Sequence, residues 1–136
     1  MRRVHIAIGF IQQGDKYLLQ LRNGEKKIGG AGLIGCFGGK IHDGEDPLMT
    51  FCREILEETS LNPKPHEVKK LGVVNVDSDH NLELVKVTGH VFHWSLKDKE
   101  KPKIKEGELI IMTKDEALAN LDKLTTGTQT AFTELL

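Results

Sequence analysis

This 136-residue sequence lacks features that define several large classes of protein. It has no apolar run of about 18 residues, the length that spans a membrane as a helix. Its start, MRRVHIAIGF, has no signal-peptide cleavage pattern and is better interpreted as a strand. The two cysteines, Cys36 and Cys52, have no metal-ligand spacing, and their apolar contexts indicate reduced, buried thiols. We therefore expect a cytoplasmic protein with no membrane partner.

The charge balance argues against a nucleic-acid-binding protein. The formal net charge is -1, so the chain offers no basic field for a nucleic-acid polymer, and binding to one is not expected. The length and the absence of an internal repeat or linker predict one domain over residues 1–136. Alternating strand and helix signals predict an α/β fold. The predicted strands are Val4–Gln12, Lys16–Leu21, Leu71–Val76, Leu82–Trp94 and Glu108–Met112, and the predicted helices are Pro47–Glu58, one opened by the capping box Thr113–Glu116, and Thr128–Leu136.

The most informative segment reads GGKIHDGEDPLMTFCREILEETSL and begins at Gly38. Asp46 is a good N-cap and Pro47 suits the first helical position, so a helix is predicted directly after the glycine turn. Its apolar residues cluster on one side, as expected of a helix that covers a core.

Acidic side chains gather on the other side of this helix. Glu54, Glu57 and Glu58 fall within a sector of roughly 100° when the chain advances 100° per residue. The like-charge pair Glu54 and Glu58 weakens a helix by about 0.2–0.5 kcal/mol, and the helix dipole disfavours anions near this end. An isolated run of this kind is usually a solvated face. The glycine turn and Glu45 ahead of it instead favour a site for Mg²⁺, which prefers carboxylate oxygens and substrate phosphates.

These residues resemble the signature of the Nudix hydrolases, G-x5-E-x7-R-E-U-x-E-E-x-G-U, where U is aliphatic. The chain has Gly39, Glu45, Arg53, Glu54, Ile55, Glu57, Glu58 and Leu61 at the fixed positions, and it departs from the signature only at Ser60, where glycine is usual. The opening MRRVHIAIGFIQQGDKYLLQLR resembles the MutT-like branch of that family. The resemblance implies a mixed central sheet sandwiched between helices, and a pyrophosphohydrolase that requires Mg²⁺, with Mn²⁺ as the alternative.

The resemblance also implies a metal site. Glu57 and Glu58 would hold the ion together with the backbone carbonyl of Gly38. Glu54 would orient or deprotonate the attacking water, and its contact with a second metal is left open. A further acid comes from a late loop, where Glu106 in the Lys105–Gly107 step is the candidate and Glu108 and Glu100 are the alternatives.

The remaining implied roles are structural or concern the phosphates. Arg53 would fix the glutamates by ion pairing, and Glu45 would brace Arg53 or the metal cluster. Arg22, at the end of the second strand, and Lys40, after the glycine turn, are the candidate phosphate-binding residues. For Lys40 a solvated lysine is the simpler alternative.

The sequence indicates the type of reaction more narrowly than the substrate. The MutT-like branch suggests a small nucleotide, in particular an oxidised, 8-oxo-dGTP-like triphosphate, cleaved to monophosphate and pyrophosphate. No purine-reading asparagine is evident, and Thr126, Thr128 or Gln129 could bond a base instead. Dinucleoside polyphosphates, nucleotide sugars, capped RNA ends, a pterin triphosphate and a non-catalytic nucleotide-binding module are the alternatives. The presence of Glu54, Glu57 and Glu58 argues for catalysis and against the non-catalytic module. We expect the protein to be a monomer or a homodimer.

One motif is rejected as a decoy. Gly30, Gly32 and Gly35 satisfy G-x-G-x-x-G, but a dinucleotide-binding turn must lead directly into a helix. The glycines here are followed by Cys36-Phe37-Gly38-Gly39 and a second turn, so no Rossmann unit is predicted.

Overall fold

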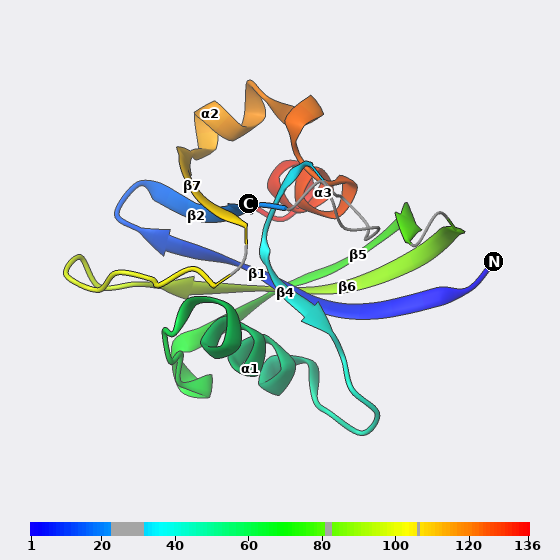
Figure 1. Cartoon of the computed structure of the whole chain (residues 1–136), viewed down its shortest axis with the longest axis horizontal. Helices are drawn as coiled ribbons and strands as arrows, with labels where there is room; N and C mark the ends of the chain where they lie inside the picture. Colours follow the sequence, from blue (N-terminus) through cyan, green and yellow to red (C-terminus); the bar gives the residue numbers. More distant parts are fainter. Residues whose placement is uncertain (23–31, 81–82, 106) are drawn as a thin grey trace.

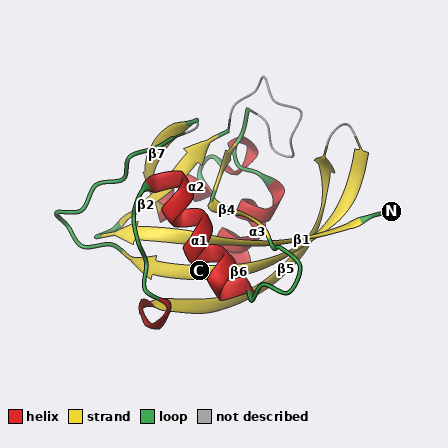
Figure 2. Ribbon diagram, turned by 60° about the horizontal axis from the view of Figure 1, so that its bottom comes forward, coloured by secondary structure: helices red, strands yellow, loops and turns green. Residues whose placement is uncertain are grey.

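A computed structural model of the chain describes residues 1–22, 32–80, 83–105 and 107–136. A sheet lies between α1 on one face and α2 and α3 on the other, as Figures 1 and 2 show. The strands are β1 (Arg3–Gln13), β2 (Lys16–Leu21), β3 (Ile34–Gly35), β4 (Phe37–Lys40), β5 (Val68–His80), β6 (Glu83–Ser95) and β7 (Glu108–Thr113). The helices are α1 (Pro47–Thr59), α2 (Lys114–Leu118) and α3 (Thr126–Glu134), with short 3-10 turns at Pro65–Glu67 and Leu121–Lys123.

The sheet is mixed, and β1 organises it. Its strand order is β3-β2-β1-β6-β5, with β4 also paired to β1 and β7 paired to β2. The β1–β6 pair is parallel, and the other pairs are antiparallel. The first half of β1 bonds β4, with Ile8 opposite Gly38, and its end bonds β2, with Ile11 opposite Leu18. This register brings the glycine turn to the middle of the sheet.

Alternation along β1 divides the core into two clusters. Ala7 and Ile11 pack under α1 with Phe51 and Ile55, where Phe51 also stacks on Phe92. Ile8 and Phe10 point to the opposite face, toward α3. There Phe10, Tyr17 and Phe132 form three edge-to-face ring contacts with centroids 4.7 to 5.6 Å apart. Helices on both faces confirm the predicted α/β sandwich.

Several predicted boundaries shift. Strand β2 is as predicted, whereas β5 begins three residues earlier and ends four residues later than expected. The last helix begins at Thr126 and not at Thr128, because Thr125 acts as the N-cap and accepts a bond from the Thr128 N–H. Strands β3 and β4 occupy the segment after Gly32, so no helix opens there and the decoy is correctly rejected over the described part. In the described residues, no helix is long and apolar enough to cross a membrane.

Candidate active site

The carboxylate-bearing helix α1 begins and ends as its sequence indicates. The side chain of Asp46 accepts a bond from the Leu48 N–H at 2.9 Å, and Pro47 occupies the first turn. The helix ends at Ser60, whose φ of 63° is left-handed and whose N–H donates to Leu56 O at 3.1 Å. Ser60 therefore adopts the conformation that favours glycine, at the one position where the chain departs from the signature.

Helical geometry explains why the three glutamates have different surroundings. Glu58 is seven residues after buried Phe51, so the two lie within about 20° of each other around the helix. Glu58 therefore faces the sheet, so the prediction that all three acids lie opposite the apolar side is wrong for Glu58. Its Oε1 accepts a bond from the Gly38 N–H at 3.0 Å. Glu57 projects outward, and its side chain is 57% exposed. Glu54 lies between them and is 16% exposed.

Arg53 connects three of the acidic residues. Its Nε and Nη2 donate to the two oxygens of Glu45 at 2.8 and 3.0 Å. Its Nη1 donates to Glu54 at 3.0 Å and to Glu57 at 3.2 Å. The bond from Arg53, followed by one from the Thr50 hydroxyl, lowers the pKa of Glu45 to about 2. Glu45 thus stays ionised and holds Arg53 against the other two acids.

Two glycines of β4 allow this packing. Gly38 has a φ of 147°, and a Cβ there would collide with the Ala7 carbonyl. A Cβ on Gly39 would lie 2.5 Å from Glu54 Cδ. Larger residues would therefore separate β4 either from β1 or from the Glu54 carboxylate.

The acid cluster has the donors and the charge that suit a divalent cation. Burial raises the pKa of Glu58 to about 7, and the charges of Glu54 and Glu57 add to this effect. A bound cation would offset the repulsion among these carboxylates, and their oxygens are the hard ligands that magnesium prefers. With the present side-chain positions, no three His, Cys, Asp or Glu side chains in the described residues converge on one point. The chemistry of these carboxylates is compatible with a divalent cation, but their roles as metal ligands stay predictions.

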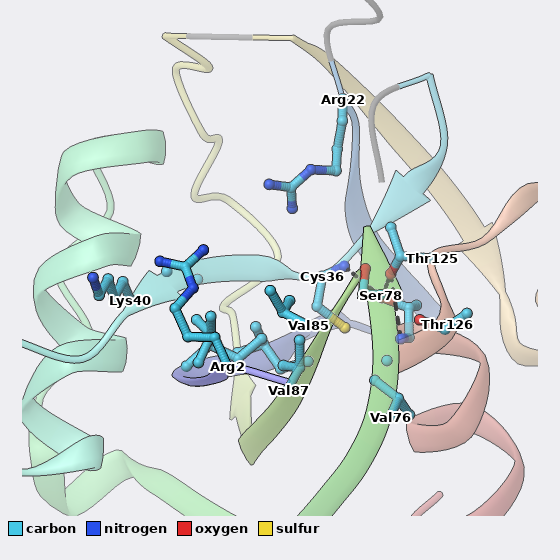
Figure 3. Close-up of a pocket in the computed structure, with 17 residues that line it drawn as sticks. Arg2, Arg22, Cys36, Lys40, Val76, Ser78, Val85, Val87, Thr125 and Thr126 are labelled. Carbon is cyan, nitrogen blue, oxygen red and sulfur yellow. Dashed lines mark hydrogen bonds between the residues drawn. The ribbon is translucent and has the colours of Figure 1, made fainter. Parts of the chain in front are cut away.

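A cavity of about 230 Å³ opens beside this cluster, on the α3 face of the sheet. Figure 3 shows side chains from β1, β4, β5, β6 and the start of α3 directed around it. Its floor is aliphatic and is formed by Val4, Ile6, Ile8, Val76, Val85 and Val87. Its polar wall carries the hydroxyls of Ser78, Thr125, Thr126 and Thr128. An apolar space with a few hydroxyls is typical of a small-molecule site.

Cationic side chains line the same cavity. Arg22 and Lys40, the predicted phosphate-binding residues, both belong to its lining, and Arg2 is a third cation there. Within the described part of the chain, Arg22 Nε is buried and has no hydrogen-bond partner. Burial lowers the pKa of Arg22, and the nearby charge of Glu58 partly opposes that shift. An anionic ligand would supply the missing partner.

The three candidate base-reading residues lie in different places. Thr126 and Thr128 line the cavity, whereas Gln129 donates its amide to Leu124 O at 3.2 Å and does not line it. Thr128 Oγ1 already accepts bonds from the Cys36 N–H at 3.0 Å and the Thr125 hydroxyl at 2.8 Å. Among the described residues, the Thr126 hydroxyl has one contact, 3.5 Å from Asp77 O, so Thr126 is the best placed of the three.

The late acid is only partly located. Glu106 lies outside the described residues, so its role stays a prediction. Glu108 begins β7 opposite Leu21, and Glu100 belongs to a loop bonded to Gln13. The backbone N–H groups of Lys103 and Lys105 donate to Thr59 O and Glu58 O at 2.8 and 3.2 Å, which ties this loop to the end of α1.

Sequence reasoning missed part of the cavity lining. Arg2, Ser78, Thr125 and the aliphatic floor were not assigned to a site. The alternation of Arg2, Val4, Ile6 and Ile8 was the one available signal, because these residues share a strand face. The remaining lining depends on pairing between strands far apart in sequence.

The chain was compared with known proteins. The NUDIX domain model matches residues 1–133. The fold is similar to a MutT protein from Methanosarcina mazei Go1, with 20% identity, a TM-score of 0.78, and coverage of 98% of this chain and 93% of that one. It is also similar to a MutT NUDIX hydrolase from Burkholderia pseudomallei, with 22% identity, a TM-score of 0.70, and full coverage of both chains.

A third similar structure is a bifunctional NMN adenylyltransferase/ADP ribose pyrophosphatase from Francisella tularensis, complexed with AMP and a Mn ion. It has 16% identity and a TM-score of 0.69, and the match covers 96% of this chain but 40% of that one. No curated protein matches this sequence. Because the domain match spans nearly the whole chain, the protein belongs to the Nudix family and is a pyrophosphohydrolase.

Proposed function

We propose that the protein cleaves a nucleoside triphosphate, with Mg²⁺ or Mn²⁺, to a nucleoside monophosphate and pyrophosphate. The observation that carries this proposal is the position of β4 between the cavity and α1. Gly38, Gly39 and Lys40 line the cavity, and the Gly38 N–H bonds Glu58. A nucleoside in the cavity would therefore extend its phosphates along β4 toward the acids.

The acids would divide two tasks. The cation would be held by Glu57, Glu58, Glu54, the Gly38 carbonyl and Glu106. It would neutralise the charge of the phosphates. Glu54 would also orient the attacking water or accept its proton. The water oxygen bonds to phosphorus as the bridging P–O bond breaks, and pyrophosphate carries away the bonding pair.

The cationic residues would act on position and charge. Arg53 would keep Glu54 and Glu57 in place and Glu45 would keep Arg53 in place, in agreement with their contacts of 2.8 to 3.2 Å. Arg22 and Lys40 would bind the departing phosphates, which suits the unpartnered Nε of Arg22 in the described structure. A guanidinium matches phosphate geometry because its donors form a planar fork.

The cavity also bears on the nucleoside. At about 230 Å³ it is smaller than the ~300–1,000 Å³ pockets of drug-sized ligands, which supports one nucleoside over two. Thr126 would bond the base edge, in place of the asparagine that the MutT-like branch suggests. The first substrate to test is 8-oxo-dGTP beside dGTP. We place this activity in the cytoplasm, in a monomer or homodimer.

The test is a screen with Mg²⁺ in which products are identified by chromatography. The panel contains dGTP, 8-oxo-dGTP, ADP-ribose and a dinucleoside polyphosphate, and Glu54→Gln prepared in parallel reports any contaminating activity. We expect monophosphate and pyrophosphate from a triphosphate. Orthophosphate without pyrophosphate at early times would contradict the proposed cleavage. Equal kcat/KM for dGTP and 8-oxo-dGTP would remove a role in clearing oxidised nucleotides but leave the triphosphate hydrolase.

A further inference from the structure

Arg2 lies at one end of the cavity, in a position that β1 dictates. Side chains alternate between the faces of a strand, so Arg2 shares a face with Val4, Ile6 and Ile8, and all four line the cavity. The backbone of Arg2 is held at the sheet, where the Lys86 N–H donates to Arg2 O at 2.8 Å. Arg2 therefore extends the cavity wall beyond the last aliphatic residue.

The pairing of β1 with β4 shows where Arg2 lies relative to the acids of α1. Gly38, which bonds Glu58, is opposite Ile8, and Lys40 is opposite Ile6. Arg2 directly precedes β1, four residues before Ile6, and lies on the same face as Ile6. A chain of phosphates that starts at Gly38 and passes Lys40 therefore runs toward Arg2.

Arg2 and Arg22 approach the same space from opposite sides. Figure 3 shows the Arg22 side chain descending and the Arg2 side chain rising into the same region of the cavity. In the described residues the lining contains no carboxylate, and Glu58, whose charge acts on Arg22, lies outside it. Arg2 has an ion pair with Glu83 at 3.7 Å, but side-chain exposures of 51% and 56% make such a pair weak and easily exchanged. Two like charges directed at one space suit an anion between them.

We propose that Arg2 and Arg22 form a clamp for the terminal phosphate of the substrate, which makes the enzyme select nucleoside triphosphates over diphosphates. The proposal rests on the proposed triphosphate hydrolysis and adds Arg2 as a specificity-determining, substrate-binding residue. A diphosphate bound at Gly38 and Lys40 would end before it reaches Arg2. A third phosphate would reach the clamp and accept charge-assisted hydrogen bonds from it.

The kinetic test compares Arg2→Ala with Arg3→Ala. Arg3 is the matched control, because it removes the same charge one residue away but donates to Thr88 Oγ1 at 2.6 Å and does not line the cavity. We expect Arg2→Ala to lower kcat/KM for dGTP by about 10-fold through KM, with kcat within about twofold. The inhibition constant of dGDP should stay within about twofold, and Arg2→Lys should restore part of the loss. An equal effect of Arg2→Ala on dGTP and dGDP would overturn the clamp.

A binding test separates the clamp from the proposed reaction. Inorganic tripolyphosphate and pyrophosphate are titrated into the wild type and both variants by calorimetry, without divalent cations. We expect about 10-fold weaker tripolyphosphate binding in Arg2→Ala only, with pyrophosphate unchanged. Equal tripolyphosphate affinity in Arg2→Ala and Arg3→Ala would refute the clamp. If no triphosphate is hydrolysed while the tripolyphosphate difference persists, the proposed function fails and the clamp stands.

Discussion

Replacing Gly39 with alanine would test whether the position of Glu54 controls the rate. A Cβ at residue 39 would lie 2.5 Å from Glu54 Cδ, and 2.6 and 2.8 Å from its oxygens, whereas ordinary contacts begin at 3.4 Å. The carboxylate must retreat by about 1 Å, a displacement that can cost about 10²-fold when it moves a catalytic group. We expect kcat to fall by about that factor.

The fold should tolerate the same substitution. The crowded atoms are at the end of a flexible side chain, and Gly39 does not have a positive φ. Arg53 keeps its bonds to Glu45 and Glu57, so the loss of its 3.0 Å contact with Glu54 costs about 1 kcal/mol, and the lower chain entropy of alanine offsets about 0.4–1 kcal/mol. The melting temperature should therefore change little, so activity and stability separate.

The assay measures pyrophosphate release at saturating Mg²⁺ and thermal unfolding by circular dichroism. Gly14→Ala is the matched control, because Gly14 has a φ of 65° and a Cβ there would meet no atom within 4 Å. It should lose about 1 kcal/mol of stability and keep its kcat. Glu54→Asp shortens the acid and leaves room for the new Cβ. The double variant with Gly39→Ala should therefore lose less kcat than the two single variants would lose if their effects multiplied. A wild-type kcat in Gly39→Ala, or full additivity, would refute the reasoning.

Four other predictions concern the site and its surroundings. Chelation of divalent cations should abolish turnover, and Glu57→Gln should lower kcat at least ~100-fold while circular dichroism shows an unchanged fold. Glu106→Gln should slow turnover by ~10–10³-fold and Glu108→Gln much less, and the reverse order in steady-state assays would move the late acid by two residues. Burial raises the pKa of the Cys36 thiol to about 12, so above about pH 9 the unfolded chain releases a proton that the folded chain retains. The urea midpoint of unfolding should therefore fall as the pH rises above about 9, and it should fall less steeply in Cys36→Ala. Ser60→Gly should raise stability by about 0.5–1 kcal/mol in urea unfolding without changing kcat, because the left-handed φ of 63° disfavours serine.

The arrangement on α1 was predictable because helical geometry is local. The spacing of Glu54 and Glu57 predicts their directions. Glu58 was grouped with them, but it lies within about 20° of Phe51 around the helix, which accounts for its partial burial. The contact between Arg53 and Glu45 crosses from the loop to the helix over only eight residues. The resemblance implied this contact as one of two alternatives for Glu45, and the cap at Asp46 fixes the path of the chain between the two residues.

The cavity could not be predicted in this way, because it depends on contacts distant in sequence. Val85 and Val87 reach it only because β6 pairs with β1 in parallel, which no local pattern indicates. The start of α3 was misplaced because Thr125 and Thr128 are both acceptable helix caps, and the tertiary contact from Cys36 to Thr128 favours the earlier start. Glycine-rich β4 has a weak strand pattern, since two of its four residues lack side chains.

The segment from Cys36 to Lys40 would link the proposed nucleoside site to the acids of α1. The Cys36 N–H donates to Thr128 in the cavity wall, the Gly38 N–H donates to Glu58, and the Lys40 carbonyl accepts a bond from Arg53 at 3.3 Å. These three bonds tie alternate residues of one short stretch first to α3 and then to α1. A shift of the cavity wall by a poorly fitting nucleoside would therefore displace the partners of Glu58 and Arg53 as well. Selectivity should then appear in kcat as well as in KM, because the residues proposed to contact the nucleoside and those proposed to position the acids share one backbone.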